Sequence, residues 1–121
     1  MTIKEVSEKF HISADTLRYY EKIGLIDPVS RNANGIRNYQ ESDINRIEFL
    51  RCMRLSGLSI QMLLEYLELA SQGDQTIQLR KEILLRQKEM ILDKMHELQE
   101  TLDHLNHKID TYDEKLSQKI I

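Results

Sequence analysis

A short basic and aromatic cluster, Arg18, Tyr19 and Lys22, is the part of this 121-residue sequence best suited to binding chemistry. In a helix these side chains share one face, because each residue advances by about 100° around the axis. An arginine can bind a base edge or a phosphate with two hydrogen bonds, a tyrosine offers a ring and a hydroxyl, and a lysine offers a point charge. Thr16 lies on the flank of this face and can donate to a phosphate. The cluster predicts a nucleic-acid contact surface, and a solvated helix face is the alternative.

A second basic segment follows shortly after this cluster. Arg31 and Arg37 flank Asn34-Gly35, and an Asn-Gly pair is the strongest short-range hairpin signal because both residues accept a positive φ. We therefore predict a two-stranded β-hairpin wing with its tip at Asn34-Gly35. Together with Tyr39, the wing can contact the DNA backbone beside the helix.

Several short helices must position these residues. Ser13 can cap a helix that ends at Gly24, and a preceding helix over residues 3–10 is separated from it by about three residues. This short gap predicts a helix-turn-helix, with Leu17 and Tyr20 facing inward. Asp27-Pro28 stops helical structure, and two further helices are expected, opening at Ser42-Asp43 and Ser59 and covering residues 42–56 and 60–70.

From about Thr76 the sequence has neither glycine nor proline and follows a heptad pattern. Nine of the ten seam positions are apolar or aromatic: Leu84, Lys88, Ile91, Met95, Leu98, Leu102, Leu105, Ile109, Tyr112 and Leu116. Such a helix must bury its seam against a partner, so a homodimeric coiled coil is expected. The seam alone leaves parallel and antiparallel pairing open. We expect a DNA-binding domain over residues 1–70, a linker over 71–75 and a dimerisation helix over 76–121.

Charge and composition narrow the class of protein. The net charge is −3, yet residues 1–58 carry 9 Lys and Arg against 8 Asp and Glu, a net +1, so the basic side chains must be focused on one surface. No apolar run approaches the roughly 20 residues of a membrane span, and the start does not resemble a secretory signal. A single cysteine, Cys52, cannot form an intrachain disulfide, which favours a reduced, cytoplasmic setting. Without a glycine-rich phosphate loop or a nucleophile–base pair, we expect neither an enzyme nor a cofactor.

The sequence resembles the MerR family of bacterial transcription regulators. The resemblance covers residues 1–70 almost without gaps and rests on these segments: Ile3-Lys4-Glu5-Val6-Ser7, Ile12-Ser13, Thr16-Leu17-Arg18-Tyr19-Tyr20-Glu21-Lys22-Ile23-Gly24-Leu25, Asn34-Gly35-Ile36-Arg37-Asn38-Tyr39, Asp43-Ile44 and Gly57-Leu58-Ser59. The Thr-Leu-Arg-Tyr-Tyr-Glu string with the Gly-x-Arg-x-Tyr wing is far more specific than a helix-turn-helix pattern alone. The long helix is similar to the dimerisation helix of the family, which pairs antiparallel.

The resemblance implies a mechanism and residue roles. A dimer would bind a pseudo-palindrome in a promoter whose spacer is too long, and would bend and untwist that spacer. An effector would change the dimer so that the promoter elements realign and RNA polymerase can start transcription. Polymerase would thus be an indirect partner. Arg18 and Tyr19 would be the main helix contacts, with Thr16 and Lys22 in support. Arg31, Arg37 and Tyr39 would be the wing contacts, and Tyr20 would pack in the core.

The effector is less defined. The cysteines of the family's metal sensors are absent. The histidines of the long helix, His96, His104 and His107, lie outside the seam, so we expect them to be solvated and to bind no metal. The alternative is a metal site formed by two of these histidines with Asp103 or Asp110. We expect no separate drug-binding domain after the long helix, and the sequence resembles the aldehyde- and electrophile-responsive branch of the family.

Cys52, between Arg51 and Met53, is the remaining candidate sensor. Arg51 and Arg54 would favour its thiolate, so we hypothesise a thiol switch for reactive carbonyl or oxidant species. The alternative is a buried cysteine that only packs. Two alternatives also stand for the whole chain: an architectural DNA-binding protein without an effector, and a coiled-coil interaction module that does not bind DNA.

Overall fold

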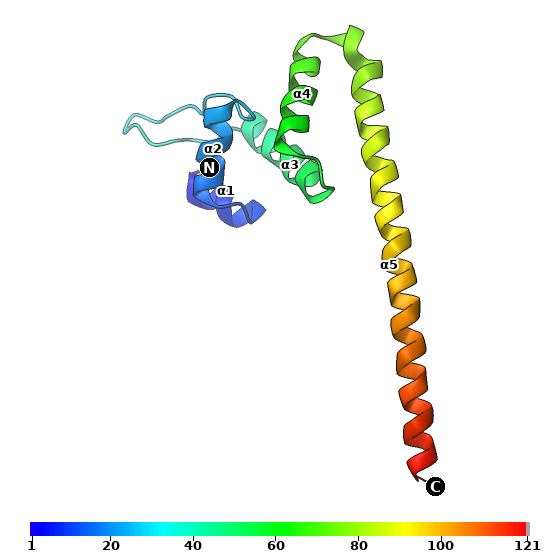
Figure 1. The fold of residues 1–121 in the computed structure, drawn as a ribbon. Helices are drawn as coiled ribbons and strands as arrows, with labels where there is room; N and C mark the ends of the chain where they lie inside the picture. Colours follow the sequence, from blue (N-terminus) through cyan, green and yellow to red (C-terminus); the bar gives the residue numbers. More distant parts are fainter. Residues whose placement is uncertain (121) are drawn as a thin grey trace. The chain divides into compact units, whose positions relative to one another are not determined.

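Helices account for most of the chain in a computed structural model, which describes residues 1–120 and the side chains of residues 1–119. The elements, in order, are α1 (Ile3–Phe10), α2 (Ala14–Ile23), α3 (Glu41–Leu55), α4 (Ile60–Ser71), the 3-10 turn η1 (Asp74–Thr76) and α5 (Ile77–Ile120) (Figure 1). They form two compact units, the first from Met1 to Ile83 and the second from Leu84 onward. None of the helices in residues 1–120 is long and apolar enough to cross a membrane.

The predicted helix-turn-helix is confirmed. The Thr2 hydroxyl accepts a hydrogen bond from the Glu5 amide (3.2 Å), and the Glu5 carboxylate accepts one from the Thr2 amide (3.1 Å), which together form a reciprocal cap at the start of α1. The Ser13 hydroxyl accepts from the Thr16 amide (3.1 Å) and starts α2. Gly24 ends α2 with φ of +86°, a conformation that other residues adopt only with strain.

One hydrophobic core holds the helices of the first unit together. Leu17 and Tyr20 of α2 are buried, as predicted, and pack with side chains from α1, α3, α4 and the loops. Burying each large apolar side chain contributes roughly 1.5–3 kcal/mol, so this core fixes α2 in place. Its buried members are Val6, Phe10, Leu17, Tyr20, Leu25, Ile26, Val29, Tyr39, Ile47, Leu50, Leu58 and Leu63.

The predicted β-hairpin wing is not supported, because residues 1–120 contain no β-strand. Residues 29–39, which we call the wing loop, form an irregular loop in which Arg31 and Arg37 make one isolated antiparallel bridge. The turn spans Asn32 to Gly35, whose amide donates to the Asn32 carbonyl (3.0 Å), so the tip lies one residue before the predicted Asn34-Gly35. The Asn32 side chain accepts from the Asn34 and Ile36 amides (2.9 and 3.1 Å). These side-chain bonds hold the turn, and the two limbs of the loop pair around a single bridge, which is too little for a β-strand.

The start of α3 also differs from the prediction. Gln40 caps the helix in place of Ser42, because the Asp43 carboxylate accepts a hydrogen bond from the Gln40 amide (2.8 Å). Asp43 is therefore inside the first turn, where a carboxylate also interacts favourably with the helix dipole.

The first turn of α5 is bonded to the end of α4. The buried Thr76 hydroxyl lies 2.6 Å from the Leu69 carbonyl and donates to it, and the Arg80 Nε donates to the Thr76 hydroxyl (3.1 Å). The Arg80 Nη2 donates to the Gly73 carbonyl (3.2 Å). These bonds satisfy carbonyl groups at the junction and begin the long helix at Ile77, one residue after the predicted start.

The second unit is the remainder of α5. Most seam side chains of the predicted heptads are exposed in the single chain, including Leu98 (68%), Leu105 (55%) and Leu116 (58%). A row of leucines along a helix is stabilised when a partner surface removes it from water, so this exposed seam is suited to binding a partner.

Candidate nucleic-acid interface

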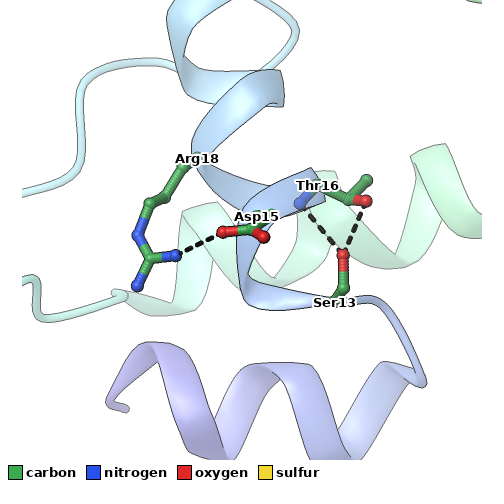
Figure 2. A network of polar contacts seen from close by, with 4 residues as sticks. All are labelled: Ser13, Asp15, Thr16 and Arg18. Atoms are coloured by element: carbon green, nitrogen blue, oxygen red, sulfur yellow. Dashed lines mark hydrogen bonds and ion pairs between the residues drawn. The ribbon is translucent and has the colours of Figure 1, made fainter.

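Three of the predicted contact residues share the exposed face of α2. Arg18 and Lys22 are exposed, and Tyr19 is 49% exposed. Figure 2 shows that the Arg18 guanidinium reaches back to Asp15, with Nη1 2.9 Å from Oδ1. Their side chains are 48% and 96% exposed, so this pair is weak and Arg18 can exchange the carboxylate for a phosphate or a base edge.

Thr16 has a local role that the sequence did not indicate. Its hydroxyl and that of Ser13 share a hydrogen bond of 2.8 Å, beside the cap that starts α2 (Figure 2). Thr16 is half-buried, so a phosphate contact from its hydroxyl would compete with the bond to Ser13.

The two wing arginines differ in their surroundings. Arg31 is exposed, and its Nη1 donates to the Gly35 carbonyl across the wing loop (2.8 Å). Arg37 points back to α2, with its Nε 3.0 Å from the Glu21 Oε1, and the side chains of Arg37 and Glu21 are 22% and 19% exposed. Arg31 thus presents charge at the surface, whereas the charge of Arg37 is balanced by Glu21.

Tyr39 is buried at the end of the wing loop, with 2% of its surface exposed. Its amide donates to the Met1 carbonyl (2.7 Å), but its hydroxyl is buried and has no hydrogen-bond partner in residues 1–120. Burial raises the pKa of Tyr39, partly offset by the positive charge of Arg37. The side chain therefore packs in the core rather than facing solvent.

Replacing Tyr39 with phenylalanine is expected to stabilise the protein by about 1 kcal/mol, because a buried hydroxyl without a partner keeps its desolvation cost. Thermal and urea unfolding measure this change. The raised pKa of Tyr39 adds a second expectation: the folded state favours neutral tyrosine, so wild-type stability falls as the pH rises above 10, and Tyr39→Phe lacks this component. A lower unfolding midpoint for Tyr39→Phe at neutral pH would show that the hydroxyl has a partner.

Cys52 lies on α3 and is exposed, so the alternative expectation of a buried packing residue is wrong. The neighbouring arginines are bonded elsewhere: the Arg51 Nε donates to the Phe10 carbonyl (2.8 Å), and the Arg54 Nη1 donates to the Leu58 carbonyl (2.8 Å). The thiol is thus accessible to a reagent, and both guanidinium groups serve the packing of α3.

The three histidines of α5 do not form a metal site with their neighbours. The His96 Nε2 lies 3.2 Å from the Glu100 Oε1 on an exposed face. Within the part of the chain that the structure describes, no three His, Cys, Asp or Glu residues are grouped so that they can hold a metal ion.

Glu21 is the residue of this region that the sequence prediction missed. It follows Arg18 by three residues and precedes Lys22, so an acidic residue stands at the flank of a basic helix face. That placement was the available signal, since an unpaired carboxylate near phosphates is unfavourable and implies a partner cation.

Comparison with known proteins gives consistent results along the chain. Residues 1–70 match the MerR HTH family regulatory protein model, and residues 44–108 match the family model described as MerR, DNA binding. The chain is 48% identical over 93 residues to the HTH-type transcriptional regulator AdhR of Bacillus subtilis, a match that covers 77% of this chain and 66%, just under two thirds, of that relative.

Solved structures agree. A MerR family transcriptional regulator from Listeria monocytogenes superimposes with a TM-score of 0.80 at 47% identity, covering 93% of this chain and 86% of that one. HiNmlR, a MerR family regulator lacking the sensor domain and bound to promoter DNA, gives a TM-score of 0.85 at 32% identity with the same coverage. These relatives are transcriptional regulators and not enzymes. The chain therefore belongs to the MerR family of helix-turn-helix DNA-binding transcriptional regulators.

Proposed function

We propose that the protein binds a pseudo-palindromic promoter site as a homodimer and regulates transcription by distorting a long spacer, with RNA polymerase as an indirect partner. The observation that carries this proposal is the exposed face of Arg18, Tyr19 and Lys22 on the second helix of a helix-turn-helix. The promoter DNA bound by the relative HiNmlR supports it. In this proposal the protein acts in the cytoplasm, where promoter DNA and polymerase are present.

The proposed contact set divides between α2 and the wing loop. Arg18 and Tyr19 read the major groove, with Thr16 and Lys22 in support. Arg31 approaches the backbone from the exposed side of the wing loop. Arg37, paired with Glu21, and the buried Tyr39 support the base of that loop.

The proposed domain organisation follows from these roles. Residues 1–70 bind DNA, residues 71–75 link, and residues 76–121 dimerise as an antiparallel coiled coil through the exposed heptad seam. The two DNA-binding domains of a twofold dimer then face two half-sites. DNase footprinting on the protein's own upstream region, at two salt concentrations, tests the function: protection of two adjacent half-sites that weakens steeply with salt supports it, and salt-independent or absent protection rejects it.

We further propose that Cys52 is the sensor, in the manner of an electrophile-responsive regulator. Its exposure on α3 permits reaction, and a covalent adduct there would disturb packing against the wing loop or the dimerisation helix. The proposed effectors are thiol-reactive aldehydes. The Cys52 thiolate adds to the β-carbon of an α,β-unsaturated aldehyde, and the α-carbon takes up a proton.

Cys52→Ala is expected to bind the promoter with wild-type affinity and to lose induction of a promoter reporter by acrolein, since the reacting sulfur is gone. A reporter assay with and without the aldehyde, beside a gel shift of the same variant, measures both effects. Serine at position 52 is the matched polar control and should behave as alanine does. Full induction in Cys52→Ala would reject the sensor and favour a regulator that has no thiol effector.

A further inference from the structure

The tip of the wing loop is held by its own hydrogen bonds. The Asn32 amide donates to the Ile36 carbonyl (2.8 Å), and the Asn32 side chain accepts hydrogen bonds from two amides. The Arg31 guanidinium donates across the loop to the Gly35 carbonyl. At the base, the Asn38 amide donates to the Ser30 carbonyl (2.7 Å). The loop thus has a defined internal shape, but these bonds do not set its direction relative to the recognition helix.

The base of the loop is tied to the N-terminus, because the Met1 amino group donates to the Asn38 Oδ1 (3.2 Å) and to the Tyr39 carbonyl (2.9 Å). The Glu21–Arg37 ion pair adds a direct bond between the loop and α2. It joins the returning limb of the wing loop to α2 over a sequence separation of 16 residues, with a 3.0 Å contact between the two charged groups. Each side chain is about one-fifth exposed, so water screens the pair less than it screens the Arg18–Asp15 pair. Breaking such a part-buried pair is costly, because each charged group is left with little water to solvate it.

The position of Glu21 on α2 links this constraint to DNA binding. Glu21 lies one helical turn after Arg18, beside Lys22, so Arg37 is held at the flank of the proposed contact face. The charge of Arg37 is then unavailable to the DNA, although the residue itself is needed.

We propose that Glu21 is a positioning residue for DNA binding, which, through its ion pair with Arg37, locks the wing loop to the recognition helix so that both meet the duplex at a fixed spacing. This rests on the proposed function of the α2 face. Arg37 acts in the same way, as an anchor and not as a phosphate contact. The buried Tyr39, two residues on, packs in the hydrophobic core.

The test measures promoter affinity of the full chain against salt concentration for Glu21→Gln, Arg37→Gln, the double variant and the charge swap Glu21→Arg with Arg37→Glu. Each single variant should lose about tenfold in affinity with an unchanged salt slope, and the double variant should lose about the same tenfold, because one interaction is removed in all three. The swap should recover to within about threefold of wild type. Lys22→Gln is the matched control and should flatten the slope by about 1.8 for a dimer, at roughly 0.9 per phosphate contact.

Hydrogen exchange of the free protein gives a readout that does not need DNA. The Asn38 amide should exchange faster in Glu21→Gln and recover in the swap, measured well below each variant's melting midpoint. The positioning role is overturned if Arg37→Gln flattens the salt slope as Lys22→Gln does, if Glu21→Gln binds like wild type, or if the folded swap fails to recover. Unchanged slope in Lys22→Gln, with recovery in the swap, would instead reject the proposed contact face and keep the ion-pair anchor.

Discussion

Replacing Leu98 and Leu105 together with aspartate is expected to convert the protein to a monomer and to lower its promoter affinity at least a hundredfold. Both side chains are more than half exposed in the single chain and lie on the proposed seam. In a dimer each would be buried, at a gain of roughly 1.5–3 kcal/mol per side chain, whereas a buried unpaired carboxylate costs several kcal/mol. Loss of the dimer removes the second half-site, and linked binding is typically worth a factor of about 10²–10⁴.

Sedimentation equilibrium and a gel shift measure the two parts of this result. His104→Asp with His107→Asp is the matched control, because it places the same new charges on the same helix outside the seam. That control should remain dimeric and bind DNA within a fewfold of wild type. A Leu98/Leu105 aspartate variant that stays dimeric would show that the subunits meet on another surface.

Arg18→Ala is expected to lower promoter affinity by at least about thirtyfold without changing the unfolding midpoint. A well-formed arginine contact to a base contributes about 1–3 kcal/mol, and a dimer loses it in both half-sites. The fold should be unaffected, because the exposed Arg18–Asp15 pair contributes only about 0–1 kcal/mol.

Fluorescence anisotropy on the promoter site and on a scrambled duplex measures the loss and its specificity. Asp15→Asn is the informative control: it frees the guanidinium without removing it, so its affinity should equal or slightly exceed that of wild type. Arg18→Ala that binds both duplexes like wild type would remove α2 as the recognition helix and favour the reading of the chain as a coiled-coil interaction module.

The helices were predictable from local chemistry. The Thr2–Glu5 and Ser13–Thr16 caps lie three residues apart, and Gly24 needs only its own backbone freedom to end α2, so a short window of sequence specifies each boundary. Leu17 and Tyr20 recur at helical spacing, which identifies their buried face without knowledge of the partner helices. The start of α3 was missed because glutamine is not a preferred N-cap, although Asp43 carries the decisive bond.

The wing was harder to predict because side chains competed with the main chain. Asn-Gly signals a two-residue turn, but the Asn32 side chain bonds the Asn34 and Ile36 amides and shifts the turn by one residue. A pattern that counts residue types cannot determine which of two asparagines accepts these bonds. The wing loop is basic and exposed at Arg31, as predicted, but it does not form a regular hairpin.

By itself the sequence determined the helix-turn-helix, the exposed Arg18–Tyr19–Lys22 face and the heptad seam, because caps, glycines and periodicity act within a few residues of one another. Only the tertiary structure decided how the remaining basic and polar side chains are used. Arg37 and Tyr39 have the same expected role in the sequence, yet one is paired with Glu21 and the other is buried in the core. Contacts between residues 16 or more positions apart depend on how α1, α2 and the wing loop pack, and no local pattern encodes that packing.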